Sequence, residues 1–284
     1  MKKLALSFLL TLFIQNYPAA QTMTNKNFKV LKVSDQVYVF EEAERYRVNL
    51  VAITGTSGII LLDTGFKLYA DDLADTLKSL NSGDVKFIIN SHTDRDHVEA
   101  NYIFGTDITI IGHKNCDDFF KKSGAKSVTF DNSYFFKFND IDIQCTAYPG
   151  GHTSCDIIVY VPNLNIAYLG DLYFSESFPR SDIESGSKAQ VLLKHLKKIY
   201  SVLPEETILI PGHGRATTMD ELKTYIDMVE STMRIIKDEM DKGKSLKEIQ
   251  DADVLKDWNK WGTFFPMINK TTWVNNVYLS YSGE

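Results

Sequence analysis

Alternating apolar and polar positions dominate the first half of the 284-residue chain. Segments with this period of two, bounded by turn residues, are typical of β-strands. Two early hairpins are expected, one turning at Ser34-Asp35 and the other through residues 55–58. The continuous apolar run at 85–90 indicates a strand buried on both faces. The strands expected in this half and just beyond it are 28–33, 36–41, 49–54, 58–63, 85–90, 108–111, 141–147, 157–161 and 166–169.

The second half of the chain has a different period. Apolar residues recur there at three- and four-residue spacing, which predicts helices at 189–202 and 219–242 on either side of a strand at 207–210. The first half has one comparable segment, 69–80, with Leu73, Leu77 and Leu80 on one face. Because strands occur in both halves and helices separate them, we expect an α/β fold with two packed sheets and helices outside.

Composition narrows the class of protein. Apolar residues make up 44% of the chain and charged residues 24%, with 16 Gly and 7 Pro. These proportions exclude disordered, collagen-like and coiled-coil proteins. A chain of this size buries roughly 75% of its unfolded surface, so one large domain over residues 21–284 is the simplest organisation.

The first twenty residues have the layout of a secretory signal peptide. Lys2 and Lys3 precede an apolar run at 4–14, and the small residues Ala19 and Ala20 follow it. We therefore expect a signal peptide at 1–20 and an exported protein, periplasmic or secreted. The apolar run is shorter than the roughly 20 residues that cross a membrane, and no later stretch approaches that length, so no membrane span is expected in the mature protein.

Charge bears on the partners. The whole chain carries a net charge of −6, and loss of Lys2 and Lys3 would make the mature protein more acidic still. An acidic surface repels phosphates, so nucleic acid is not an expected partner and a small-molecule substrate is. The oligomeric state stays open.

Three cysteines, Cys116, Cys145 and Cys155, occur without a C-x-x-C pair. Export would permit one disulfide with one thiol left over. Three buried free thiols are an equal alternative, because Cys145 lies in an apolar strand pattern.

The strongest chemical signal follows the strand at 85–90. The run Ser91-His92-Thr93-Asp94-Arg95-Asp96-His97 holds two imidazoles and two carboxylates within six residues. If the chain stays extended after the strand, His92, Asp94 and Asp96 project to one side, and His97 turns away at the start of a helix at 98–104. Such a run reaches two points in space, which suits two metal ions better than one.

Three later residues extend this cluster. His152, Asp171 and His213 each lie beside glycine, and Asp171 and His213 each follow a predicted strand. Glycine permits tight turns near a crowded site, and loops at strand ends present functional groups. Four of the six histidines fall in the set; the other two, His113 and His195, we treat as incidental.

These residues resemble a known signature. His92-x-Asp94-x-Asp96-His97, followed by His152, Asp171 and His213, is similar to the H-x-H-x-D-H pattern and separate later ligands of the metallo-β-lactamase superfamily. Leu62-Asp63-Thr64-Gly65 and Pro211-Gly212-His213-Gly214 look like two further motifs of that family. The resemblance covers essentially residues 28–284. It implies an αββα sandwich, two mixed sheets packed face to face with helices outside, and a catalytic domain at 21–284.

The resemblance also implies a ligand set, with one departure. His92, Asp94 and His152 would hold one metal ion, Asp96, His97 and His213 the other, and Asp171 would bridge them. Asp94 stands where the family has its second histidine, so the cluster loses one positive charge. We expect a weaker Lewis acid and a bridging water of higher pKa. The cofactors expected are two divalent ions, zinc first, with iron or manganese favoured more than in the all-histidine set.

The function that this implies is a binuclear metal-dependent hydrolase. A metal-bound hydroxide, oriented by Asp96 as the catalytic residue, would cleave a carbonyl-type bond in a β-lactam, lactone, thioester or other ester. One alternative is a redox di-iron protein related to the flavo-diiron branch, which carries a carboxylate at the position of Asp94. Against it, only 71 residues follow His213, without a phosphate-binding glycine loop. The other alternative is a homologue without metal or catalysis.

Two loops are candidates for substrate contact. The segment 41–48 contains Tyr46 and Arg47 between two strands, and 173–186 contains Phe174 and Arg180. A surface-loop role is the alternative for each. The lysine that many β-lactamases of this family place after the bridging ligand is missing from Leu172-Tyr173-Phe174, which argues against classical β-lactam recognition. The aromatic tail, with Trp258, Trp261, Phe264, Phe265 and Trp273, is expected mainly in the core.

Overall fold

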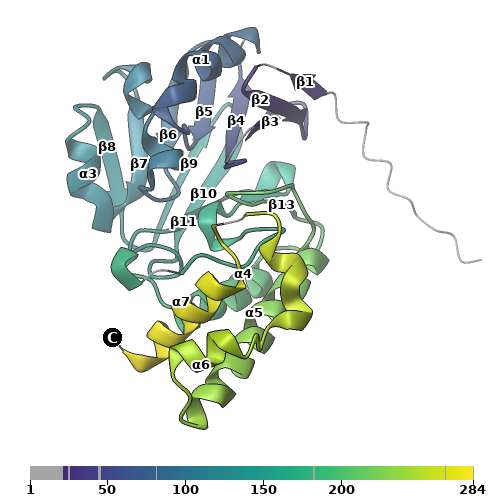
Figure 1. Ribbon diagram of the computed structural model, residues 1–284. Helices are drawn as coiled ribbons and strands as arrows, with labels where there is room; N and C mark the ends of the chain where they lie inside the picture. Colours follow the sequence, from purple (N-terminus) through teal and green to yellow (C-terminus); the bar gives the residue numbers. More distant parts are fainter. Residues whose placement is uncertain are drawn as a thin grey trace, which may run out of the picture.

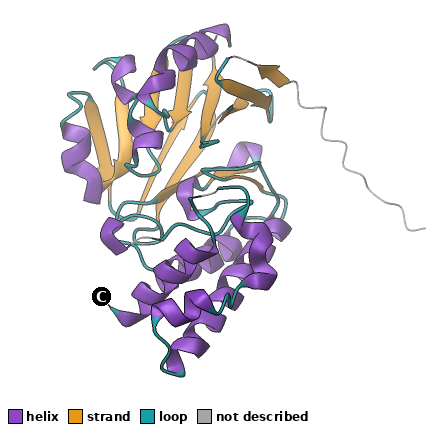
Figure 2. Cartoon of the chain, viewed as in Figure 1, coloured by secondary structure: helices purple, strands orange, loops and turns teal. Residues whose placement is uncertain are grey.

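Two β-sheets stacked face to face form the centre of the protein (Figure 1, Figure 2). The computed structural model describes residues 22–24, 26–43, 46–80, 82–181, 183–265 and 267–283. The signal peptide expected at 1–20 lies outside these residues. The sheets and their helices confirm the α/β sandwich expected from the sequence.

The first sheet has eight strands in the order of the sequence. Neighbours from β1 to β5 are antiparallel, and those from β5 to β8 are parallel. The strands are β1 (Thr22–Thr24), β2 (Phe28–Lys32), β3 (Val37–Glu42), β4 (Asn49–Gly55), β5 (Gly58–Leu62), β6 (Val85–Ile89), β7 (Thr109–His113) and β8 (Lys126–Phe130).

The second sheet has five strands in the order β13-β12-β11-β10-β9. The β12–β13 pair is parallel, and the other neighbours are antiparallel. The strands are β9 (Ser133–Phe138), β10 (Ile141–Ala147), β11 (Ile157–Val161), β12 (Ile166–Tyr168) and β13 (Ile208–Ile210).

Helices cover the outer face of each sheet. On the first sheet lie α1 (Ala70–Ser79) and α3 (Asp117–Lys121). On the second lie α4 (Ala189–Val202), α5 (Met219–Asp241), the short α6 (Leu246–Asp251) and α7 (Lys270–Ser282), which gather in the lower half of Figure 1. Short 3₁₀ turns connect several elements, at Lys67–Tyr69, Asn101–Phe104, Lys114–Cys116, Pro162–Leu164, Gly170–Leu172, Ile183–Ser185 and Lys256–Gly262.

Three apolar cores hold these layers together. In β4, Val51 and Ile53 face the core between the sheets, whereas Leu50 and Ala52 face the core under α1. Because successive side chains of a strand point to opposite faces, a strand buried on both sides reads as a continuous apolar run. The third core joins the second sheet to α4, α5 and α7, and Trp273 of α7 is fully buried in it. The aromatic tail therefore belongs largely to the core, as expected.

The predicted start of the helix at 98–104 is wrong. α2 runs over Arg95–Val98, and a 3₁₀ turn at Asn101–Phe104 follows it. Asp94 has the extended backbone of a helix N-cap residue, with φ −66° and ψ 149°. The chain is therefore extended only as far as Asp94, and Asp96 reaches the cluster from a helical turn rather than from an extended segment.

The sequence interpretation also missed several elements, namely β1, β8, β9, α3 and α6. Among the described residues no helix is both long and apolar enough to cross a membrane.

Candidate metal centre

The side chains of the cluster converge from the carboxyl ends of four strands. His92, Asp94, Asp96 and His97 follow β6, His152 follows β10, Asp171 follows β12, and His213 follows β13. β6 belongs to the first sheet and the other three strands to the second, so the cluster lies at one shared edge of the sandwich. The structure thus brings together all seven residues singled out in the sequence.

The first group consists of His92, Asp94 and His152. Their candidate ligand atoms all lie within 4.8 Å of one another. Nε2 of His152 is 3.4 Å from Oδ2 of Asp94, and Nε2 of His92 is 3.9 Å from the same oxygen. Both imidazoles are buried, whereas the Asp94 side chain is 24% exposed. Asp94 therefore faces the cluster, in the position of a ligand.

The second group consists of Asp96, His97 and His213, with candidate ligand atoms again within 4.8 Å of one another. Nε2 of His213 is 3.3 Å from Oδ2 of Asp96. Asp171 lies between the two groups: its Oδ2 is 3.5 Å from Nε2 of His152 and 3.3 Å from Nε2 of His213. A carboxylate placed in this way can bridge two cations.

Each of the four histidines is held through its Nδ1 atom. His152 donates to the backbone oxygen of Arg180 at 2.9 Å, and His213 donates to that of Tyr46 at 2.7 Å. His97 Nδ1 lies 2.7 Å from a carboxylate oxygen of Asp63, and His92 Nδ1 lies 2.9 Å from Oγ of Ser91. These contacts keep a proton on Nδ1, so that Nε2 is the nitrogen available to a metal ion once the imidazole is neutral, as in metal-ligating histidines.

Several of the converging atoms are buried without a hydrogen-bond partner. Among the described residues they include Nε2 of His92, His97 and His152, and Oδ1 of Asp171. Buried polar atoms are costly to leave unsatisfied, so four of them facing one point indicate a missing ligand. Imidazole and carboxylate donors in this number suit divalent metal ions.

Asp63 organises the floor of the cluster. Its buried carboxylate accepts hydrogen bonds from the Ser91 backbone and hydroxyl, from the Tyr168 hydroxyl at 2.6 Å and from His97. Its backbone is left-handed, with φ 55°, which is uncommon outside glycine and occurs at functional sites. The turn at 62–65 was noted in the sequence, but the role of its carboxylate was not.

Two further buried side chains hold the ligand loops. Asp156 accepts hydrogen bonds from the backbone N–H groups of Gly151, His152 and Thr153. Asn49 donates to the backbone oxygens of Pro211 and Gly214, on either side of His213. The partners of Asn49 are remote in sequence, and the contacts of Asp156 depend on the shape of its loop. Residue spacing alone therefore did not reveal either side chain.

The loop before His213 also requires glycine. A Cβ atom at Gly212 would lie 1.9 Å from Oδ1 of Asp171 and 2.8 Å from the backbone of Gly170. Only a residue without a side chain permits the two ligand loops to approach this closely.

The electrostatics of the cluster follow from charges packed in a buried space. Burial opposes the charged form of Asp171, but His213 and His97 outweigh it and hold the pKa of Asp171 well below its usual value. The pKa of Asp96 falls to about 2 in the same way, against burial, mainly through His97 and His213. Conversely, Asp94 and Asp171 overcome burial and raise the pKa of His152 to about 9. The protein thus maintains three ionised carboxylates at neutral pH.

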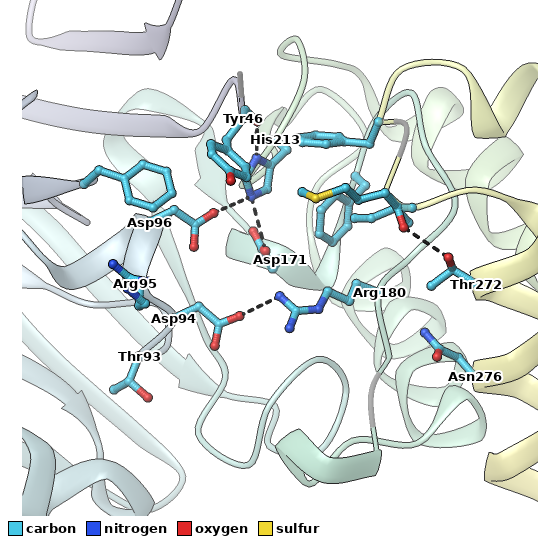
Figure 3. Close-up of a pocket in the computed structure, with 15 residues that line it drawn as sticks. Tyr46, Thr93, Asp94, Arg95, Asp96, Asp171, Arg180, His213, Thr272 and Asn276 are labelled. Carbon is cyan, nitrogen blue, oxygen red and sulfur yellow. Dashed lines mark hydrogen bonds and ion pairs between the residues drawn. The ribbon is translucent and has the colours of Figure 1, made fainter. Parts of the chain in front are cut away.

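The cluster opens into a cavity of about 590 Å³ (Figure 3). Tyr46, Phe174 and Arg180, three of the four substrate-loop candidates, line it. Arg47 does not; it forms an ion pair with Glu41, and its guanidinium lies 4.4 Å from the centre of the Phe264 ring. The other residues lining the cavity are Phe66, Thr93, Asp94, Arg95, Asp96, Asp171, His213, Phe265, Met267, Ile268, Thr272 and Asn276.

Phe174 and Arg180 have distinct places in this cavity. Phe174 is buried and stacks on the His213 ring, with ring centres 5.2 Å apart. Arg180 is 43% exposed, and its Nη1 donates to Oδ2 of Asp94 at 3.0 Å. Phe265 of the aromatic tail, expected mainly in the core with pocket lining as the alternative, lines this cavity. Met267, Ile268, Thr272 and Asn276, which the sequence did not single out, line it as well.

A disulfide joins Cys116 to Cys155 beside the first group. Cys155 follows His152 by three residues, and the Thr93 hydroxyl lies 3.5 Å from Sγ of Cys116. Cys145 is the free, buried thiol. Of the two arrangements open from the sequence, one disulfide with one remaining thiol is therefore confirmed. His113 and His195 lie outside the cluster and donate to the backbone oxygens of Asp131 and Pro149.

Comparison with known proteins gives a family and a fold. Residues 43–213 match the model of the metallo-beta-lactamase superfamily. Among curated proteins, one from Mycobacterium tuberculosis is 28% identical over 89 residues, 30% of this chain and 39% of that protein. One from Aquifex aeolicus is also 28% identical over 89 residues, 31% of this chain and 41% of the relative. Both are described as uncharacterized, and the chain spans about two fifths of their length.

Solved structures share the architecture at low sequence identity. A metallo-beta-lactamase from Pontibacter korlensis aligns with a TM-score of 0.62 at 17% identity, over 72% of this chain and 99% of that one. A variant of a sec-alkyl sulfatase aligns with a TM-score of 0.67 at 16% identity, over 89% of this chain and 50% of the other. A flavo di-iron protein variant from Thermotoga maritima aligns with a TM-score of 0.57 at 16% identity, over 74% of this chain and 62% of that one.

Proposed function

Because the chain belongs to the metallo-β-lactamase superfamily, we propose that it is a hydrolase that holds two divalent metal ions in its seven-residue cluster and cleaves a carbonyl-type bond. The substrate bond would be an ester, thioester, lactone or lactam. One observation supports the proposal above the others: buried Nε2 atoms of His92, His97 and His152 converge without a hydrogen-bond partner among the described residues.

The two groups divide the proposed ligands. His92, Asp94 and His152 would hold one ion, and Asp96, His97 and His213 the other, with Asp171 shared. When bound, two divalent ions supply Lewis-acid activation of water and polarisation of a carbonyl oxygen.

Asp96 is the proposed catalytic residue. Its side chain is 18% exposed and lines the cavity, so a water molecule can reach it. Because its pKa is about 2, it is ionised at neutral pH and can accept a hydrogen bond from the attacking water. Asp96 and His213 belong to the same group, so an ion bound there would hold the carboxylate in place while it orients that water.

Arg180 offsets the departure at Asp94. The carboxylate of Asp94 adds one negative charge to the ligand set that the family usually carries, and the guanidinium of Arg180 supplies one positive charge at 3.0 Å. Charges this close and partly shielded from water interact strongly. The guanidinium of Arg180 therefore offsets the charge that Asp94 adds to the cluster.

The metal identity belongs to the proposal as well. Zinc is the first expectation for this family. Three carboxylates and four imidazoles give a harder donor set than one with a further histidine, which makes iron or manganese stronger alternatives. Elemental analysis of protein purified without added metal tests this. Two zinc ions per chain that iron does not displace would contradict the shift toward harder ions.

The test of hydrolysis is a substrate screen with a chelator arm. Nitrocefin, lactones, thioesters and simple esters would be offered to the metal-loaded protein, to chelated protein and to the His152→Gln variant. Turnover that disappears in the last two supports the proposal. His195→Gln is the matched control, because this histidine lies outside the cluster, donates to the Pro149 backbone oxygen and packs against Tyr148. Turnover that survives chelation and His152→Gln would contradict a metal-dependent reaction.

Redox di-iron chemistry is the second candidate, favoured by one observation. Asp94 places a carboxylate at a position within the first group, and a flavo di-iron protein variant is among the structures with a similar fold. Such chemistry needs an electron donor. Bound iron together with reductant-dependent consumption of oxygen or nitric oxide, without hydrolysis, would favour this candidate over the hydrolase.

Export is proposed from residues 1–20, and the Cys116–Cys155 disulfide supports it, because disulfides persist in oxidising compartments. Mass spectrometry of the protein from its native host should give a mature N-terminus near Gln21. Recovery of the uncleaved chain from the cytoplasm would contradict export.

A further inference from the structure

The connection between β3 and β4 holds one of the proposed metal ligands from behind. The backbone oxygen of Tyr46 accepts a hydrogen bond from Nδ1 of His213 at 2.7 Å (Figure 3). Val48, two residues later, forms an isolated β-bridge with His213. The partner on Nδ1 sets the orientation of a ligating imidazole. The position of the Tyr46 carbonyl therefore bears on the second group of ligands.

The backbone that presents this carbonyl has an unusual conformation. Arg47, the next residue, is left-handed with φ 49°, which is unfavourable for a residue other than glycine. The fully buried carboxylate of Glu42 accepts hydrogen bonds from the N–H groups of Tyr46 at 2.9 Å and of Arg47 at 2.7 Å. Such a conformation persists only when the surrounding contacts enforce it.

The side chain of Arg47 supplies further contacts of this kind. Its Nε donates to Oε1 of Glu41 at 2.7 Å, and its Nη2 donates to the same oxygen. The Glu41 side chain is only 8% exposed, so solvent screens this ion pair weakly. The guanidinium carbon also lies 4.4 Å from the centre of the Phe264 ring, within the range of a cation–π interaction. Glu41, Arg47 and Phe264 thus form a clamp.

The clamp reaches His213 from a second side through the tail. Phe264 packs against Phe265, with ring centres 5.2 Å apart, and the Phe265 ring is nearly perpendicular to that of His213 at 5.0 Å. Both phenylalanines lie after the residues that match the family model. The aromatic part of the clamp therefore comes from outside the matched part of the chain.

We propose that Arg47 is a positioning residue of the metal centre. Its clamped side chain fixes the Tyr46 carbonyl and, through that carbonyl, the imidazole of His213. The inference rests on the proposed function, but it concerns the retention of metal rather than the bond that is cleaved. Because the contacts of Arg47 lead to the second group, it should matter for one of the two ions more than for the other.

Arg47→Gly isolates the contribution of the side chain. Glycine adopts φ 49° readily, so this variant removes the contacts with Glu41 and Phe264 without adding backbone strain. Titration of metal-free protein with Co²⁺, followed by visible absorption, measures the affinity for each ion. One affinity should fall about tenfold and the other change less than about twofold, as expected when a ligating histidine loses the support of its partner.

Two ligand variants show whether Arg47 acts through His213. In a His152→Ala background the second group keeps all its ligands, so Arg47→Gly should still weaken binding of Co²⁺ about tenfold. In a His213→Ala background the supported imidazole is gone, and Arg47→Gly should weaken binding less than about twofold further. A general loss of stability would lower the affinity in both backgrounds.

Phe264→Leu tests the aromatic part of the clamp. Leucine keeps an apolar side chain without a ring face for the guanidinium, so the loss of affinity should be in the same ion as in Arg47→Gly, but smaller. Phe135→Leu is the matched control. Phe135 is 61% exposed on β9, at the opposite edge of the second sheet from β13, which precedes His213. It should leave both affinities unchanged.

Two results would overturn the inference. One is wild-type affinity for both ions in Arg47→Gly. The other is an equal loss in the His152→Ala and His213→Ala backgrounds, which would make Arg47 a support of general stability. Failure of the hydrolase proposal is a separate result, because the titration needs no turnover. A protein in which Arg47→Gly weakens one ion but which hydrolyses nothing would keep the role of Arg47 and lose the proposed function.

Discussion

At the scale of single residues, the side chains behind the cluster matter as much as those in it. The Asp63 carboxylate contacts the Nδ1 atom of His97, while the Nε2 atom of His97 lies near Asp96 and His213. Burial opposes the charged form of Asp63, but His97 outweighs it and lowers the pKa of Asp63. The ionised carboxylate therefore holds the imidazole in one tautomer and one orientation.

Asp63→Asn should weaken metal binding without unfolding the protein. The amide can no longer accept from His97 as a carboxylate does, and loss of such a partner typically costs about 10- to 100-fold in metal affinity. Competition with a chromophoric chelator measures it. Tyr168→Phe, which removes only one donor to Asp63, should cost less. Wild-type affinity in Asp63→Asn would show that His97 does not depend on this carboxylate.

Asp96→Asn should remove most turnover while the fold is retained. If Asp96 orients the attacking water, the loss in kcat/KM should be about 10²- to 10⁴-fold. Steady-state kinetics on a substrate from the screen, with circular dichroism and metal content as checks, measure this. Asp84→Asn, which alters an exposed carboxylate before the amino end of β6, at the opposite end of this strand from the cluster, is the control. Activity above about a tenth of wild type would remove Asp96 from its proposed role.

The sequence identified the cluster itself better than its surroundings. His152, Asp171 and His213 stood out because each lies beside glycine, and Asp171 and His213 because each also ends a strand. Asp156 and Asn276 did not stand out. Asp156 acts through a loop whose shape is not visible in spacing, and Asn276 lies in a helix pattern that is typical of the core.

At the scale of elements, the disulfide fastens one ligand loop and lies against another. Cys155 lies in the loop that bears His152, and the Cys116 sulfur contacts the hydroxyl of Thr93, the residue between His92 and Asp94. The bond ties the loop after β10 to the turn after β7, and the loop from β6 packs against it through the hydroxyl of Thr93. Restricting both loops reduces the conformational entropy that must be lost when they come together on a metal ion.

Replacing both cysteines with serine should lower stability and metal affinity together. The bond spans a sequence separation of 39, and chain-entropy arguments assign a loop of that length about 4 kcal/mol. Thermal unfolding and chelator competition give the two quantities. Cys145→Ala, which alters the free buried thiol, should lower stability modestly and leave metal affinity unchanged. Unchanged metal affinity in the double serine variant would separate the disulfide from the centre.

Elements with their own periodicity were predicted well, and those that depend on a partner were not. The range of α4 was predicted in full, because its apolar residues recur on one face. β9 was missed: it is an edge strand whose side chains alternate between exposed and half-buried, and pairing with β10 defines it. α2 begins three residues earlier than expected, and the residue at its N-cap, Asp94, directs its carboxylate toward the cluster and forms no side-chain cap hydrogen bond.

At the scale of the whole molecule, the metal centre is coupled to protons. Without metal, Asp94 and Asp171 overcome burial and raise the pKa of His152 to about 9, and Asp171 and Asp96 do the same for His213. Near neutral pH these imidazoles carry protons that partly neutralise the three carboxylates. A metal ion requires the neutral imidazole, so binding displaces those protons.

Metal binding should therefore release protons at pH 7, and metal affinity should rise with pH up to about 9. Calorimetry in two buffers of different ionisation enthalpy counts the protons. The stability of the metal-free protein should change with pH in the opposite direction. Histidines with raised pKa values stabilise it fully below about pH 6.5, and this contribution is lost as the pH rises through about 9. Absence of proton release at pH 7 would contradict the charge state described for the cluster.

The tail supplies a wall of the cavity but, among the described residues, none of the grouped candidate metal ligands. Part of the cavity wall is thus encoded in a stretch of the gene separate from the proposed metal ligands. Mutations after residue 265 can change what the protein accepts and leave its reactive centre intact. Directed evolution toward new substrates would do best to randomise that terminal stretch first.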